Sequence, residues 1–261
     1  MTIPPLIGMI HLGALPGSPR YDGALGGVVD QSLADANTLA SAGFDAVMVE
    51  NFGDVPFFPD DVPAVTVAAM TRVITEVSMA IDLPIGVNVL RNDAMSAMSI
   101  AAATGASMIR VNVLSSMMYT DQGPIVGRAA ELARLRSAIA PDVLVLADVF
   151  VKHASPPPGA TIELSAIDAW ERSGADALVI SGTGTGTSVD LEDLKRVARV
   201  VPEAPLVIGS GADAGNVAVL AESVRSVIVG SSLKPNHDVT LPIDETLAVE
   251  FVSVARAAGL V

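Results

Sequence analysis

The sequence predicts a single (β/α)8 TIM barrel, with a closed, parallel, eight-stranded sheet, over residues 1–261. Short runs rich in Val and Ile alternate with helical patterns along the whole chain, and eight such pairs can be counted. The length suits one barrel, and no Pro-, Gly- or Ser-rich linker divides it. Hydrophobic side chains make up 51% of the chain but aromatic ones only 3%, as expected for aliphatic strands covered by Ala-rich helices. A doubly wound open sheet is the alternative, although no Gly-x-Gly-x-x-Gly follows the first strand.

The predicted elements can be placed in order along the chain. The strands are the short apolar runs Leu6–His11, Ala46–Glu50, Ile85–Leu90, Met108–Val113, Val143–Val149, Ala177–Ser181, Leu206–Gly209 and Ser226–Val229. The helices that follow them are Val28–Ala42, Ala64–Ile81, Ala94–Thr104, Ile125–Ile139, Ile162–Ser173, Leu191–Val200, Ala214–Ala221 and Glu245–Ala258. Gly43, Gly105 and Gly174 each stand just before a strand, where a left-handed helix C-cap is expected. The longer segments 12–27, 51–63 and 114–124 follow strands, so we assign them to the functional face.

Charge and composition exclude several classes of partner. The formal net charge of −14 disfavours direct binding to nucleic acid or to an anionic membrane. No run approaches the ~18 apolar residues of a membrane span, so no integral membrane segment is predicted. The chain has no cysteine, which excludes disulfides and thiolate chemistry and fits a cytoplasmic location. A small phosphorylated metabolite stays a candidate partner, because backbone N–H groups can bind phosphate locally. Homo-oligomerisation is left open.

Polar residues end six of the predicted strands. Side chains alternate between the two faces of a strand, so every second residue lies on the same face. In each of these strands, one face is apolar along its length and ends in a polar residue at the C-terminal end. The polar members are His11, Glu50, Asn88, Arg110 with Asn112, Asp148 and Ser181. The pattern does not say which parity faces the barrel interior. If these polar groups faced the helices, each would need a hydrogen-bond partner inside an aliphatic layer. At the top of the barrel they would reach solvent, so a ligand-binding rim is favoured. Singly, each residue could instead make a loop hydrogen bond or an ion pair.

Turns rich in glycine and serine follow the last three predicted strands. They contain Ser181-Gly182-Thr183-Gly184, Gly209-Ser210-Gly211 and Gly230-Ser231. Glycine lets backbone N–H groups approach an anion closely, and hydroxyls add donors. Barrels frequently hold phosphate after strands seven and eight, so we expect a phosphate site here, with tight connecting turns as the alternative. Lys234, just beyond, supplies a positive charge in one interpretation and is an exposed loop lysine in the other.

The end of the fifth predicted strand carries the densest chemistry. Asp148, Lys152 and His153 place a carboxylate, an amine and an imidazole within six residues, and proton transfer and Schiff-base formation both use such groups. A divalent metal such as Mg²⁺ at Asp148 is left open, although three histidines without metal-type spacing support it poorly. Asp93 is expected to cap a helix. Asp121 is expected in a turn, with a lid role second.

Several motifs together resemble the BtpA/SgcQ family from end to end. They include Gly8-Met9-Ile10-His11-Leu12, Glu50-Asn51-Phe52-Gly53-Asp54, Gly86-Val87-Asn88-Val89-Leu90, Arg110-Val111-Asn112-Val113, Thr120-Asp121-Gln122-Gly123, Ala147-Asp148-Val149 and Val229-Gly230-Ser231-Ser232-Leu233-Lys234. The resemblance implies a ribulose-phosphate-binding type of barrel. The family's functional labels differ, since one member is a photosystem I factor and another belongs to sugar utilisation. Phe150 stands where a polar residue, often histidine, is expected in this family.

We therefore expect an enzyme of sugar or nucleotide metabolism that acts on a phosphosugar or nucleotide-like compound by isomerase, epimerase, lyase or glycosidic-bond chemistry. The catalytic candidates are Asp148, Glu50, His153 and Lys152, and the substrate-binding candidates are His11, Asn88, Arg110, Asn112, Asp121 and Ser181. The phosphate-binding candidates are Gly182, Thr183, Gly184, Gly209, Ser210, Gly211, Gly230 and Ser231. The alternative is a non-catalytic assembly factor for a photosystem-type membrane complex. Such a factor needs a basic or amphipathic patch, and the sequence shows none.

Overall fold

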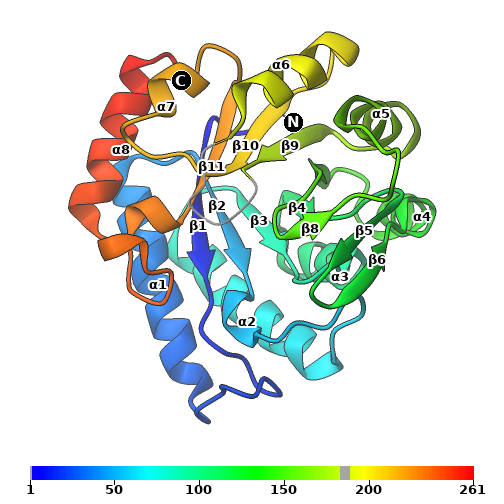
Figure 1. Ribbon diagram of the computed structural model, residues 1–261. Helices are drawn as coiled ribbons and strands as arrows, with labels where there is room; N and C mark the ends of the chain where they lie inside the picture. The colour runs from blue at the N-terminus through cyan, green and yellow to red at the C-terminus, as the bar shows by residue number, and fades with distance from the viewer. Residues whose placement is uncertain (1, 183–188) are drawn as a thin grey trace.

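The fold is the predicted closed barrel (Figure 1). The structure, a computed structural model, describes residues 2–182 and 189–261. Eight parallel strands close the barrel within the described residues: β1 (Leu6–His11), β2 (Ala46–Glu50), β3 (Ile85–Asn88), β4 (Met108–Val111), β7 (Leu144–Val149), β9 (Ala177–Ser181), β10 (Leu206–Ser210) and β11 (Ser226–Val229). The helices around them are α1 (Leu25–Ala42), α2 (Ala64–Ala80), α3 (Ala94–Thr104), α4 (Ala129–Ile139), α5 (Ile162–Ile167), α6 (Leu191–Val200), α7 (Val217–Leu220) and α8 (Glu245–Ala257).

The barrel interior is filled by the side chains of every second strand residue, which share one face of each strand. Met9, Met48, Met108, Leu146 and Val179 belong to one apolar cluster, in which each is buried. A second, larger cluster packs the opposite strand faces against the helices. The predicted polar residues share the parity of the interior cluster, so they lie directly above it at the C-terminal end of the barrel.

The strand register places four of these polar residues side by side. His11 pairs with Glu50 across β1 and β2, Glu50 with Asn88 across β2 and β3, and Asn88 with Arg110 across β3 and β4. Because paired residues of parallel strands lie at the same height, this row is fixed by the sheet itself rather than by loops.

Two of the predicted helix ends are confirmed as left-handed caps. Gly43 ends α1 with φ of 93° and Gly105 ends α3 with φ of 74°. Asp93 caps α3, as expected, because its carboxylate accepts from Ser96 N at 2.8 Å. No helix in the described part of the chain combines the length and the apolar character that crossing a membrane requires.

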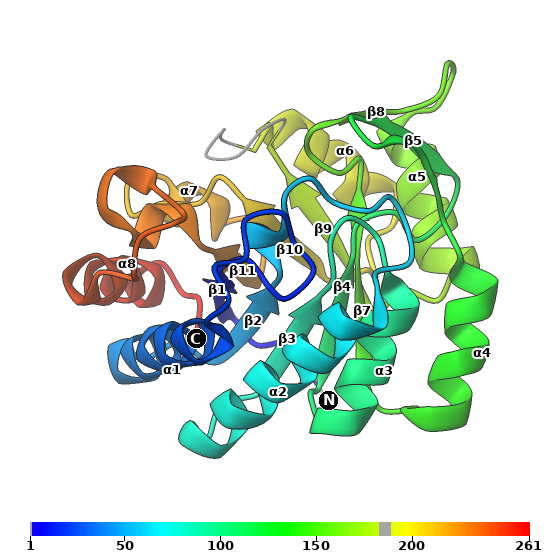
Figure 2. The ribbon, with the colours of Figure 1, turned by 90° about the horizontal axis from the view of Figure 1, so that it is seen from below.

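A small antiparallel sheet is absent from the sequence-based prediction. It consists of β5 (Met117–Thr120), β6 (Gly123–Val126) and β8 (Ala154–Ser155). In Figure 2, β5 and β8 lie together at the upper edge of the molecule. The predicted helix Ile125–Ile139 was wrong at its start, because Ile125 pairs with Met118 in this sheet and α4 begins only at Ala129. The predicted helix Ala214–Ala221 was too long in the same way, since α7 begins at Val217.

Candidate functional site

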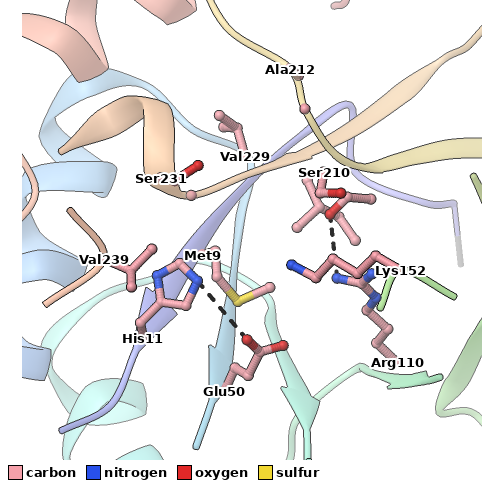
Figure 3. A pocket seen from close by; sticks show the side chains of 14 residues that line it. Met9, His11, Glu50, Arg110, Lys152, Ser210, Ala212, Val229, Ser231 and Val239 are labelled. Atoms are coloured by element: carbon pink, nitrogen blue, oxygen red, sulfur yellow. Dashed lines mark hydrogen bonds and ion pairs between the residues drawn. The ribbon is translucent and has the colours of Figure 1, made fainter. Parts of the chain in front are cut away.

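Three residues of the strand-end row, His11, Glu50 and Arg110, border a small polar cavity at the top of the barrel (Figure 3). Its volume is about 30 Å³, enough for one or two ordered waters. One wall carries His11, Glu50, Arg110 and Lys152. The other wall is built from the end of β10 and from the turns after β10 and β11, with Gly209, Ser210, Gly211, Gly230 and Ser231. The structure therefore brings the predicted strand-end row and two of the predicted glycine turns together.

Arg110 and Asp148 form a buried ion pair below this cavity. Arg110 Nε and Nη2 lie 3.2 and 3.0 Å from Asp148 Oδ1, and Nη2 lies 3.1 Å from Oδ2. Asn112 Nδ2 donates to Oδ2 at 2.6 Å. The Asp148 side chain is 0% exposed and the Arg110 side chain 2%. Both carboxylate oxygens are engaged by these two donors, so Asp148 holds Arg110 in place rather than presenting a free oxygen to the cavity.

Asn88 connects neighbouring strands in the same layer. Its Nδ2 donates to Arg110 O at 3.1 Å and to Asn112 Oδ1 at 3.2 Å. Arg110 also donates to Gly209 O at 3.4 Å, and it lies 3.5 Å from Ser181 Oγ. The predicted substrate-binding residues Asn88, Arg110, Asn112 and Ser181 are thus joined in one hydrogen-bond network. Asn88 Oδ1 is buried and has no hydrogen-bond partner among the described residues.

Glu50 and His11 face each other across the cavity floor (Figure 3). Glu50 is buried, and burial raises the pKa of its carboxyl although Lys152, Arg110 and Arg91 oppose the rise. His11 Nε2 lies 3.9 Å from Glu50 Oε1. Burial lowers the pKa of His11 well below its usual range, and nearby Lys234, Lys152 and Arg110 add to the effect. His11 is therefore a neutral imidazole, and Glu50 is a carboxyl that holds its proton to a higher pH than an exposed glutamate does.

Lys152 extends from the segment after β7 toward the cavity (Figure 3). Burial lowers the pKa of its ammonium group, while Glu50 opposes that change. Arg91 Nη2 donates to the backbone oxygen of Lys152 at 2.6 Å, which fixes the position of this segment. His153 is exposed, and burial and Lys152 lower its pKa. Of these two neighbours in sequence, only Lys152 lines the small cavity.

The glycine turns approach the cavity too closely for side chains. A Cβ on Gly230 would lie 2.7 Å from His11 Cε1, and one on Gly209 would lie 3.0 Å from Arg110 Nη2. Gly211 adopts φ of 83°, a conformation that favours glycine. Ser210 Oγ is buried and has no hydrogen-bond partner among the described residues. Gly182 is buried, and the predicted Thr183 and Gly184 lie outside the described residues.

A larger cavity of about 370 Å³ adjoins the first on the side of β2 to β4. Glu50, Arg110 and Lys152 line both cavities. Its outer wall contains Asp121 from the turn between β5 and β6, so the small sheet brings this predicted residue to the site. The other residues that line it are Phe52, Phe57, Leu90, Arg91, Asn112, Gln122 and His153. Asp148 lines neither cavity.

The donor set offers little to a metal ion. No group of three or more His, Asp or Glu side chains in the described part of the chain is placed to hold one. Asp148, the ligand considered from the sequence, is paired with Arg110, whose positive charge would repel a cation.

Three features of the site escaped sequence reasoning. Arg91 lies beyond the end of β3, so the alternation of side chains along the strand could not place it. It adds a third cation near Glu50, beside Arg110 and Lys152. Phe52 stacks edge-on against His11, with ring centroids 5.0 Å apart, and comes from a loop of unpredicted conformation. Lys234 is 2% exposed, so its interpretation as an exposed loop lysine was wrong. Asp35 on α1 accounts for this burial, because its Oδ2 lies 3.8 Å from Lys234 Nζ.

Comparison with known proteins agrees with the strand-end motifs. The BtpA family model matches residues 2–257. Photosystem I biogenesis protein BtpA of Synechocystis sp. is 43% identical over 98% of this chain and 89% of that protein. An uncharacterised protein of Thermococcus kodakarensis is 45% identical over 97% of this chain and 95% of that protein. The solved structure of N-(5'-phosphoribosyl)anthranilate isomerase from Pyrococcus furiosus shares the fold with a TM-score of 0.58, at 16% identity over 97% of this chain and 99% of that one. The resemblance is confirmed over nearly the whole sequence, and the chain belongs to the BtpA family.

Proposed function

We propose that this chain is a cytoplasmic enzyme that moves a proton within a small phosphorylated metabolite, in the manner of an isomerase or epimerase. One observation carries the proposal: Glu50, Arg110 and Lys152 line both adjoining cavities. A ligand that reached from one cavity into the other would lie against a carboxyl of raised pKa and two cationic side chains. Proton transfer next to a carbonyl group needs such a base and such charge stabilisation.

The phosphate is assigned to the turns after β10 and β11. The buried Ser210 hydroxyl, which has no partner in the described part of the chain, supports this assignment, because an unsatisfied buried donor costs about 1–3 kcal/mol unless a ligand accepts from it. Gly211 and Gly230 lack the Cβ that would keep an anion away from their backbone N–H groups. Phosphate is frequently bound at this place in barrels of this type. The neighbouring fold of a phosphoribosyl-compound isomerase is consistent with it.

Glu50 is assigned the role of general base. Its carboxylate takes a proton from a carbon next to the substrate carbonyl, the electron pair moves onto the carbonyl oxygen, and the resulting enediolate is stabilised by Lys152 and Arg110. The protonated Glu50 then returns the proton, from the same face, to the former carbonyl carbon, while the proton of the neighbouring hydroxyl moves to the former carbonyl oxygen, as in an isomerase. An epimerase would need a second acid on the opposite face of the carbon. Asp148 becomes a positioning residue in this scheme, because its two oxygens are engaged by Arg110 and Asn112. His153 and Asp121, on the wall of the larger cavity, are assigned to the rest of the substrate.

The phosphate assignment is tested with Ser210→Ala. Loss of a hydrogen bond to a charged group costs about 1.5–3 kcal/mol, so we expect the Kd for inorganic phosphate and for phosphosugars to rise about tenfold or more. Thermal shift against phosphosugars, nucleotides and phosphate, with and without Mg²⁺, identifies the ligand, and titration calorimetry gives the Kd. Ser99→Ala, at an exposed helix position, is the matched control. Equal affinity in the two variants would move the phosphate away from Ser210.

The role of Lys152 is tested by borohydride trapping. If Lys152 acts as an ammonium ion, reduction in the presence of a bound aldose or ketose phosphate should leave the mass of the protein unchanged. A Schiff base forms when an amine adds to the carbonyl and water leaves, and borohydride makes that bond permanent. If a Schiff base did form at Lys152, mass spectrometry would find an adduct in the wild-type chain and none in Lys152→Met. An adduct at Lys152 would replace the proton-transfer proposal by a lyase that works through a Schiff base.

The alternative of an assembly factor rests on the name of the Synechocystis relative. Recognition of a protein partner uses an exposed surface, whereas Glu50 and Arg110 are buried beneath a cavity. A buried carboxyl among three cations is costly to maintain and is typical of catalytic sites. The site geometry therefore favours the enzyme.

A further inference from the structure

A third compartment lies on the opposite side of His11 from the strand-end site. Its volume is about 480 Å³, and it is bounded by the segment after β1, by α1 and by the loop that follows β11. It shares His11 and Val239 with the cavity of the glycine turns and Phe52 with the larger cavity. A ligand held by the glycine turns could therefore continue past His11 into this compartment. We call it the α1 compartment.

The polar floor of the α1 compartment is incompletely satisfied. Asp35 is 1% exposed, and its Oδ1 accepts from Ile243 N at 3.0 Å and from Gln31 Nε2 at 2.9 Å. Its Oδ2 has no hydrogen-bond partner among the described residues and lies 3.8 Å from Lys234 Nζ. Lys234 is 2% exposed and donates to Val239 O at 3.1 Å, whereas an ammonium group has three N–H donors. Asp35 Oδ2 can thus accept a further hydrogen bond, and the neighbouring Lys234 ammonium group can donate further ones.

The His11 ring offers a further unused group at the edge of the same compartment. His11 Nδ1 is buried and has no hydrogen-bond partner among the described residues. Leu12, Val28 and Leu241 contribute apolar walls. A planar ring would bury its faces against such walls. If the ring carried an N–H next to a C=O, the N–H could donate to Asp35 and the C=O could accept from Lys234.

We propose that the α1 compartment binds a nucleobase-like ring, so that the phosphorylated metabolite of the strand-end site is a sugar phosphate that carries such a ring in addition to the carbonyl group on which the proposed proton transfer acts. The inference rests on the proposed function for the phosphate and the sugar, and the nucleotides of the test are probes of binding only, because their closed ribose has no carbonyl group. It adds the ring, its compartment and the paired groups Asp35 and Lys234 that recognise its edge.

The test compares ligands that differ only in the ring. Uridine 5'-monophosphate and inosine 5'-monophosphate carry an N–H next to a C=O, and ribose 5-phosphate has no ring of this kind. Titration calorimetry on the full chain should give a Kd for the two nucleotides that is at least about tenfold below the Kd for ribose 5-phosphate. This ratio corresponds to a difference of about 1.4 kcal/mol in the free energy of binding. Uridine and inosine without phosphate are titrated in parallel.

Two neighbouring glycines of α1 provide the variant and its control. Gly27 lines the compartment, and a Cβ built on it meets nothing within 4 Å. Gly27→Leu therefore adds a large side chain to the wall of the compartment without a backbone clash, and leucine favours a helix more than glycine does. A Cβ on Gly26 is equally unobstructed, but Gly26 does not line the compartment. We expect Gly27→Leu to bind the nucleotides no better than ribose 5-phosphate, and Gly26→Leu to bind them as the wild type does.

The outcomes separate this inference from the proposed function. Equal affinity of the wild type for nucleotides and ribose 5-phosphate would overturn the ring assignment, as would a nucleotide preference that survives in Gly27→Leu. A different outcome is that ribose 5-phosphate and phosphate fail to bind, while uridine or inosine binds to the wild type and not to Gly27→Leu. This result would support the ring assignment and overturn the phosphate assignment. If ribose 5-phosphate binds and Ser210→Ala weakens it while no nucleoside is preferred, the phosphate site stands alone.

Discussion

Arg110→Met is expected to lower the free energy of unfolding by about 3–5 kcal/mol, because it leaves the charge of Asp148 buried without its partner. The Asp148 side chain is 0% exposed, and Asn112 would be its one remaining side-chain donor among those the structure describes. Urea denaturation followed by circular dichroism measures the loss.

An exposed ion pair is the control for this substitution. Arg128 pairs with Asp61 and Glu131 at the surface, and its side chain is 31% exposed. Arg128→Met should have a far smaller effect, because solvent screens the charges that it leaves behind. The double variant Arg110→Met/Asp148→Leu should recover much of the stability lost by Arg110→Met alone. Equal losses for Arg110→Met and Arg128→Met would contradict the buried ion pair.

The barrel and the polar rim could be predicted because both depend on short-range patterns. Strand parity is a property of consecutive residues, so the alternation around Met9 and His11 or around Met48 and Glu50 already showed which residues share a face. That this face is the interior followed only from the apolar cluster that includes Met9 and Met48. The pairing of His11 with Glu50 follows in turn from the register of β1 and β2.

The small sheet and the engagement of Asp148 could not be predicted, because both depend on contacts between distant segments. β5 pairs with β8 through Tyr119 and Ser155, and neither strand has a pattern long enough to show this. Arg110 reaches Asp148 across the pairing of β4 with β7. Asp148 therefore remained the leading base in the sequence, whereas its geometry favours a positioning role. The pairing of Lys234 with Asp35 was missed for the same reason, since α1 and the loop after β11 meet only on closure of the barrel.

Glu50→Gln is expected to lower kcat by a factor of about 10²–10⁴, the usual contribution of a general base, with little change in phosphate affinity. The substitution keeps the shape of the side chain and removes only its ability to accept the proton. Steady-state kinetics with the ligand that thermal shift identifies gives kcat, and titration calorimetry gives the phosphate Kd. A kcat within a factor of about two of the wild type would place the base elsewhere.

The pH profile gives a second, independent reading of the same assignment. Glu50 must be ionised to act as a base, and burial raises its pKa above the ordinary 4.5, so kcat should fall as the pH drops through a value above 4.5. Lys152 must stay protonated to stabilise the enediolate, and burial lowers its pKa below 10.5, so activity should also fall on the alkaline side below that pH. Lys152 opposes the rise in the pKa of Glu50. Lys152→Met should therefore move the acid limb to higher pH, and Glu50→Gln should abolish it. An acid limb that stays in place in both variants would belong to another carboxyl.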